Sequence, residues 1–434
     1  MRRIRIPLSL ALPFLLLLPS CGGESADEPA ETVTAETAQG IIPSDVPAAQ
    51  AAYEESGELW SSSWSESVAK LHEAIELDPD FLDAHALLSY RYAWIYQYGD
   101  RADSIIQNAW TYAQNAVGLN PEALGSLSAM GAYYYRIQKD YSKAMEYYDE
   151  GSDLFPENGH FLNMRAHVAR RQGDWDGALE ILKHTDELVP SLGTVTAILE
   201  NHRYNRRWEE AMATAQEIAE RYPESTTGPS YLAWIPFYQT GNTETVRAYN
   251  ATRPATALTV NRWSVAILDR NYQEALDVMD ASETEVFTGQ NGQTPREAYR
   301  GIALRELGRE AEALEAFESA KATMEGMLPE LDHDWRVHAG LGWVNALLGN
   351  RDEAIRASER AIEILPPEKD ALAGPPNVAN LAEVYAILGD AEAAVEQIEY
   401  LLSIPGAMNR GWLRVGPVWD QIRDHPAFQA LLEG

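Results

Sequence analysis

One short pattern recurs along most of this 434-residue chain. A turn residue, often Gly followed by Asp, Asn or Arg, precedes a small residue by five positions, as Gly173 precedes Ala178. The turn residues are Lys139, Gly173, Arg206, Gly241, Arg270, Gly308, Gly349 and Gly389. Amphipathic helical patterns flank each of them, and Pro190 closes the unit that begins at Gly159, because proline cannot continue a helix. The pattern therefore predicts a series of paired helices.

The spacing of the turn residues identifies the kind of pair. Successive steps are 34, 33, 35, 29, 38, 41 and 40 residues. A period near 34 with helix-turn-helix patterning resembles the tetratricopeptide repeat (TPR) family. Residues 67–79 and 109–121 keep the spacing of a second helix, so about ten helical pairs are expected. The resemblance implies an all-α superhelical solenoid with one concave groove, whereas an irregular helical bundle is the alternative.

The resemblance varies along the predicted solenoid, which we assign to residues 48–402. It is weakest at about 227–297. There Pro229, Pro236 and Pro254 are expected to distort or cut helices, and the polar segment 282–294 is expected to form a loop.

The first 20 residues have the order of a secretory signal. Arg2, Arg3 and Arg5 precede an apolar run over residues 6–18. This basic-then-apolar order is typical of a signal peptide, and the run is too short for an ordinary transmembrane helix.

The run ends in Leu18-Pro19-Ser20-Cys21-Gly22, which resembles the lipobox of bacterial lipoproteins, although Pro19 departs from the usual residue. The resemblance implies removal of residues 1–20 and a lipid on Cys21, the single cysteine of the chain. Cleavage as an ordinary signal peptide, or an uncleaved anchor, is the alternative. Residues 21–47 would then be a disordered acidic tether. We expect a lipid-anchored protein of the cell envelope, on the outer membrane facing the periplasm if the cell is Gram-negative.

The formal net charge is −32. This charge argues against binding to nucleic acid or to anionic lipid headgroups, so membrane contact is expected through the lipid alone. Solubility, adaptation to salt and a cationic partner are the three explanations left open.

The TPR resemblance also implies which side chains line the groove. Counting from the turn residues selects Tyr133, Arg136, His160, Asn163, His167, Arg170, Arg171, Arg203, Tyr204, Tyr231 and Tyr238. Guanidinium groups bind carboxylates bidentately, so this set suits an extended protein or peptide segment that presents a carboxylate. The alternative is that these arginines pair with Asp and Glu on neighbouring helices.

Residues 403–434 resemble the ends of TPR modules attached to bacterial Ser/Thr kinases and adenylate cyclases. The matching residues are Val415, Pro417, Trp419, Asp420, Arg423, Asp424, Pro426, Phe428, Leu431 and Leu432. No kinase or cyclase motif occurs in the chain, so only a C-terminal cap on the last repeat is expected.

These observations favour a membrane-anchored scaffold for protein–protein interaction. A lipoprotein that binds a glycan or another small ligand is the alternative, since the chain has 12 Trp and 21 Tyr. An enzyme is not expected, because phosphate-loop, His-Glu-x-x-His and Gly-x-Ser-x-Gly motifs are missing. His333 and His338 are five residues apart, which does not suit a metal site on a helix, and no cofactor or metal is expected.

Overall fold

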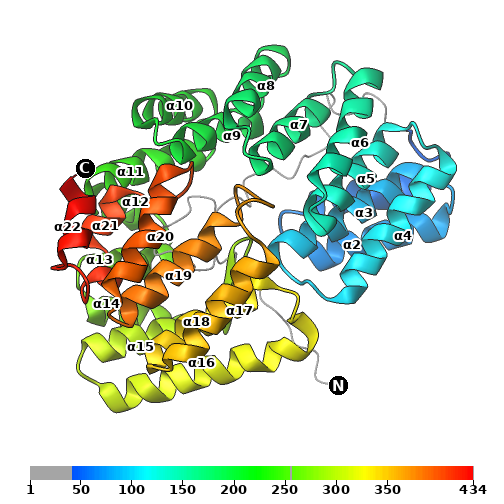
Figure 1. Cartoon of the computed structure of the whole chain (residues 1–434). Coiled ribbons are helices and arrows are strands. Elements are labelled where there is room, and N and C mark those ends of the chain that lie inside the picture. Colours follow the sequence, from blue (N-terminus) through cyan, green and yellow to red (C-terminus); the bar gives the residue numbers. More distant parts are fainter. Residues whose placement is uncertain (1–41, 255–256, 434) are drawn as a thin grey trace. The chain divides into compact units, whose positions relative to one another are not determined.

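The computed structural model describes residues 42–254 and 257–433. Over these residues, ten consecutive helical pairs run from α1/α2 to α19/α20, and strand is confined to one short hairpin (Figure 1). The predicted all-α helix-turn-helix solenoid of about ten pairs is thus confirmed. The predicted signal peptide, Cys21 and the tether as far as residue 41 lie outside the described residues.

The described chain divides into two compact units, residues 42–198 and 199–433, and each is described by itself. The N-terminal unit contains α1 (Pro47–Leu59), α2 (Trp64–Leu77), α3 (Leu82–Tyr98), α4 (Asp103–Leu119), α5 (Leu124–Ala132), the π-helix η2 (Tyr133–Gln138), α6 (Tyr141–Leu154), α7 (Gly159–Arg171) and α8 (Trp175–Leu188). The boundary falls within α9 (Leu192–Tyr204).

The C-terminal unit continues the series of pairs and ends in three short helices. Its helices are α10 (Trp208–Arg221), α11 (Thr227–Thr240), α12 (Glu244–Ala251), α13 (Thr259–Leu268), α14 (Tyr272–Asp280), α15 (Arg296–Glu306), α16 (Glu310–Leu331), α17 (Trp335–Leu348), α18 (Arg351–Ile364), α19 (Pro375–Ile387), α20 (Ala391–Ser403), α21 (Arg410–Val415), the 3₁₀-helix η3 (Pro417–Trp419) and α22 (Pro426–Glu433).

All eight turn residues of the repeat adopt the left-handed backbone conformation, with φ between 51° and 86°. Such a residue ends the first helix of each pair and turns the chain into the second. Five of the eight are glycine, which adopts positive φ without steric penalty. Lys139, Arg206 and Arg270 adopt it despite a side chain, at a penalty of about 1–2 kcal/mol each.

The small residue five positions later packs the second helix against the first. Ala144, Ala178, Ala211, Val246, Ala275, Ala313, Ala354 and Ala394 all expose 1% of their surface or less. Glycines on the first helices allow similar close approach: a Cβ at Gly131 would lie 2.3 Å from the Tyr148 ring. Regular close packing of this kind builds the solenoid from neighbouring pairs.

Two local expectations were wrong. Pro236 does not interrupt a helix but lies inside α11, where Trp234, Ile235 and Phe237 are completely buried. Tertiary packing of this apolar helix outweighs the hydrogen bond that proline removes.

The polar segment 282–294 is also more ordered than a loop. Val286–Gly289 (β1) and Gly292–Pro295 (β2) pair as an antiparallel hairpin. Arg336 at the start of α17 donates to the carbonyl of Gly289 over 2.8 Å and forms a fully buried ion pair with Asp334. A partner 47 residues later therefore orders this hairpin.

The C-terminal segment, residues 404–433, contacts two parts of its unit. It packs on α19 and α20, and α21 also lies beside α11, far earlier in the chain (Figure 1). Trp412 and Trp419 are completely buried in these contacts. The backbone N–H of Gly406 donates to the carbonyl of Tyr204 over 2.8 Å.

Among the described residues, no helix combines the length and the apolar character needed to cross a bilayer.

Candidate functional site

The predicted groove residues fall into both units, so they form two separate sets. Tyr133, Arg136, His160, Asn163, His167, Arg170 and Arg171 belong to the N-terminal unit. Arg203, Tyr204, Tyr231 and Tyr238 belong to the C-terminal unit.

The N-terminal set contains arginines from the first helices of consecutive pairs. Arg136 and Arg170 each precede a left-handed turn residue, Lys139 and Gly173, by three positions. Arg136, Arg170 and Arg171 are each only 4% exposed. Burying several guanidinium groups together is unfavourable unless anions or dipoles compensate their charge, so their surroundings decide what this surface can bind.

Aromatic and amide groups of the preceding repeat surround Arg136. Its guanidinium donates to the amide oxygen of Gln97 and to the hydroxyl of Tyr90. The guanidinium carbon lies 4.5 Å from the centre of the Trp94 ring, within cation–π range. Arg136 projects from the π-helix η2, a rare helical form that often marks functional positions.

The next repeat adds two arginines beside a histidine. Arg171 donates from Nε to the hydroxyl of Tyr135 over 3.1 Å, and Nη2 of Arg170 lies 2.6 Å from Nδ1 of His167. Desolvation, followed by the charges of Arg170, Arg136 and Arg171, holds the pKa of His167 well below its usual value. The imidazole is therefore neutral at physiological pH and accepts the hydrogen bond from Arg170.

Arg91 on α3 extends this set by one repeat toward the N-terminus. Its guanidinium lies 3.8 Å above the Trp60 ring and the residue is 5% exposed. Its Nε is buried and has no hydrogen-bond acceptor among the described residues. Burial lowers the pKa of Arg91 to about 9. We call Arg91, Arg136, Arg170 and Arg171 the basic row.

Sequence reasoning missed Arg91 because its repeat has no glycine-type turn residue from which to count. The sequence signal for Arg91 was a single basic residue within the aromatic stretch of α3, residues 90–98.

The other predicted residues of the N-terminal unit make internal contacts. Tyr133 lies in the core beside Trp110, with ring centres 4.9 Å apart. His160 is hydrogen-bonded through Nε2 to the hydroxyl of Ser128 at 2.8 Å. Asn163 donates from its amide to the hydroxyl of Thr194 over 2.9 Å.

The C-terminal set forms an aromatic cluster around one arginine. The guanidinium of Arg203 lies 4.0 Å from the Tyr204 ring centre and 5.9 Å from that of Tyr238. The hydroxyl of Tyr231 donates to Glu200 over 3.4 Å. Burial alone would lower the pKa of Arg203, but Tyr204, Tyr231, Tyr238 and Glu200 together raise it well above its ordinary value. This arginine thus has a carboxylate nearby, as the internal-pairing alternative expected.

Within the two described ranges, no three His, Cys, Asp or Glu side chains are grouped so that they could hold a metal ion. The basic row offers cations, aromatic rings and hydrogen-bond donors, which suit recognition of an anion.

The sequence comparisons give one match. Residues 200–225, the end of α9 together with α10 and the following turn, match the tetratricopeptide repeat family model. No curated protein matches this sequence.

Solved structures of helical-repeat proteins are similar to parts of the chain. The thermophilic TPR protein TTC0263 of Thermus thermophilus is 16% identical with a TM-score of 0.39, over 43% of this chain and 98% of its own. Pseudomonas aeruginosa PilF is 17% identical with a TM-score of 0.35, over 54% and 98%. The human IFIT1 dimer with m7Gppp-AAAA is 14% identical with a TM-score of 0.43, over 79% and 77%. These TM-scores are all below 0.5, so the similarities do not indicate a function.

Proposed function

We propose that this chain is a non-enzymatic interaction scaffold whose N-terminal unit captures an extended protein segment through a carboxylate bound to the basic row. The observation that carries the proposal is the burial of Arg91, which is 5% exposed and whose Nε has no acceptor in the part of the chain that the structure describes. A buried donor left unsatisfied destabilises the free protein, and an arriving carboxylate would relieve that penalty.

The composition of the rest of the chain supports the same choice of partner. The basic row gathers four buried arginines in a chain of net charge −32. The groups that most strongly affect His167 besides desolvation, namely Arg170, Arg136, Arg171 and His160, are all basic. A cluster of basic side chains within an acidic protein favours a ligand whose negative charge is confined to one point, such as a chain terminus or one acidic side chain.

The proposal includes attachment to the cell envelope through a lipid on Cys21. The basic residues at positions 2, 3 and 5, the apolar run and the lipobox-like sequence around Cys21 support it. The partner would then be another envelope protein.

The test is a selection from two random peptide libraries against the purified chain without residues 1–21. One library has free C-terminal carboxylates and acidic residues, and the other is amidated and lacks Asp and Glu. We expect enrichment only from the first library, and loss of it when Arg91 and Arg136 are replaced by Gln. Arg165→Gln is the matched control, because Arg165 lies on α7 in a partly exposed ion pair with Asp149. Equal enrichment from both libraries would contradict the proposal.

A further inference from the structure

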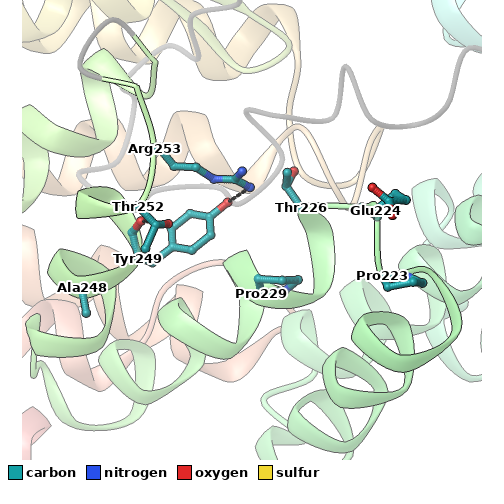
Figure 2. A pocket seen from close by; sticks show the side chains of 9 residues that line it. Pro223, Glu224, Thr226, Pro229, Ala248, Tyr249, Thr252 and Arg253 are labelled. Carbon is teal, nitrogen blue, oxygen red and sulfur yellow. Dashed lines mark hydrogen bonds between the residues drawn. The ribbon is translucent and has the colours of Figure 1, made fainter.

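A cavity of about 530 Å³ lies in the C-terminal unit, and none of its lining residues belongs to the basic row. Its walls come from the turn between α10 and α11, the first turn of α11 and the end of α12 (Figure 2). This volume lies within the range of ordinary small-molecule sites. None of its lining residues is tryptophan, so this cavity is not the Trp-lined pocket that a glycan-binding role would favour.

Most of the cavity wall is apolar. Pro223, Pro229, Ala248 and the ring of Tyr249 line it. Proline has no backbone N–H, so Pro223 and Pro229 present only ring carbons and carbonyls. Such walls suit the flat, apolar body of a small ligand.

Arg253 supplies a cation at one side. Its Nη2 donates to the hydroxyl of Tyr249 over 3.0 Å, and its guanidinium carbon lies 5.0 Å from the ring centre. Its Nε is buried and has no acceptor within the described part of the chain. Arg253 lines the cavity, so the part of its guanidinium that faces the cavity can donate to a carboxylate oxygen, which is the acceptor that its planar geometry fits best.

A second arginine holds this side of the cavity in place. Nη2 of Arg262 lies within hydrogen-bond distance of the carbonyls of Asn250, Arg253 and Pro254, at 2.6, 2.9 and 3.2 Å. These contacts close the C-terminus of α12 and fix the backbone that carries Arg253. A site whose cation is fixed beforehand loses less entropy when the ligand binds.

Glu224 lines the opposite side, across from Arg253 and Tyr249 (Figure 2). A carboxylate there disfavours a ligand with a second negative charge, since like charges repel each other.

We infer that this cavity binds a small monocarboxylic acid with a flat apolar body, with the carboxylate on Arg253 and the body between Tyr249 and the two prolines. The residues of this site and those of the basic row do not overlap.

The test uses isothermal titration of the chain without residues 1–21 against benzoate, its neutral isostere benzamide and the dicarboxylate terephthalate. We expect saturable binding of benzoate, weaker binding of terephthalate and no binding of benzamide. Arg253→Gln should weaken benzoate binding roughly ten- to hundredfold, with an unchanged circular dichroism spectrum and melting temperature. Arg356→Gln, an exposed arginine paired with Glu353 on α18, is the matched control and should leave binding unchanged.

Glu224→Gln should bring terephthalate binding close to that of benzoate. The inference is overturned if benzoate does not bind at millimolar concentration, if benzamide binds equally well, or if Arg253→Gln leaves binding intact. Equal binding of benzoate and terephthalate by the unaltered chain would overturn the restriction to monocarboxylates.

Discussion

The guanidinium of Arg270 forms an ion pair with the carboxylate of Asp420, with Nη1 2.9 Å from Oδ2 and Nη2 2.9 Å from Oδ1. Arg270 is one of the eight left-handed turn residues, and so is Arg206, which also binds the C-terminal segment. Gly241, the turn residue between them, lies so close that a Cβ there would be 2.9 Å from Val415. Three consecutive turn residues of the C-terminal unit therefore contact the C-terminal segment. Arg206 and Arg270 bind it through their side chains, which glycine could not do.

Arg206 should matter more for stability than Arg270. Arg206 donates to the carbonyls of Leu401, Ile404 and Met408 over 2.9, 2.9 and 3.0 Å. Arg206→Met should lower the free energy of unfolding by about 2–3 kcal/mol, because partly buried acceptors lose their donor. Arg270→Met should lower it by about 1 kcal/mol or less, because its ion pair is exposed. Urea unfolding measures both, and equal effects would contradict this ranking.

Two glycines of the same segment offer a matched comparison. A Cβ at Gly411 would lie 1.9 Å from the carbonyl oxygen of Phe237, whereas a Cβ at Gly406 would meet nothing within 4 Å. Gly411→Ala should therefore destabilise the C-terminal unit by about 2–4 kcal/mol through displacement of α21. Gly406→Ala should change stability by about 0.5 kcal/mol or less. Similar melting temperatures for the two variants would show that α21 does not pack on α11 as described.

The sequence was sufficient to predict the repeats, because their signals are local. A turn residue and the alanine after it, such as Gly173 and Ala178, encode one left-handed turn and one close helix contact. The hairpin at 286–295 and the uninterrupted α11 were not predictable, since each depends on packing against distant residues. The contact of Arg270 with Asp420 joins residues 150 positions apart, and no periodic pattern encodes it.

The candidate site was predicted only in part, because its residues were found by counting from local turn residues. Arg136, Arg170 and Arg171 could be counted from a turn residue, whereas Arg91 stacks on Trp60 in the irregular first repeats. Residue spacing also could not show that Tyr133 packs in the core with Trp110.

A binding role for Arg91 predicts a trade-off between stability and function. Burial of its guanidinium lowers its pKa to about 9, so the charged form destabilises the folded state. Arg91→Met should raise the free energy of unfolding by about 1–3 kcal/mol while it weakens peptide binding. Arg165→Met is the control on a partly exposed arginine of the same unit. If Arg91→Met instead destabilises the fold, Arg91 is a structural residue.

His167 should make stability depend on pH in a defined direction. Its folded pKa lies well below the ordinary value near 6.5, so the unfolded chain takes up a proton first as the pH falls. Stability from this residue is thus present above about pH 6.5 and decreases below it, by at most about 1.4 kcal/mol per pH unit. Urea unfolding between about pH 7.5 and pH 5.5 should show a smaller decrease for His167→Gln than for the unaltered chain.

Asp83 acts in the opposite direction and must be separated from His167. Burial raises the pKa of Asp83 to about 6, so its ionised form destabilises the fold at neutral pH and protonation relieves this on acidification. Asp83→Asn should therefore increase the loss of stability at low pH, whereas His167→Gln should reduce it. Parallel changes in the two variants would contradict both assignments.

The lipid anchor has a direct test. Cells fed a labelled fatty acid should incorporate the label into the unaltered chain but not into Cys21→Ser, which should also leave the membrane fraction. Label on Cys21→Ser, or none on the unaltered chain, would contradict lipidation at Cys21.

Binding of a carboxylate by the basic row can be measured directly with a single peptide. A peptide selected by the chain is labelled and prepared in two forms, with its carboxylates free and with all of them converted to amides, and fluorescence anisotropy gives the two affinities. We expect amidation to weaken binding by the unaltered chain roughly tenfold or more. The Arg170→Gln/Arg171→Gln variant should bind both forms equally weakly. The control variant Arg165→Gln should behave as the unaltered chain. Equal affinity of the unaltered chain for the two forms would contradict carboxylate binding by the basic row.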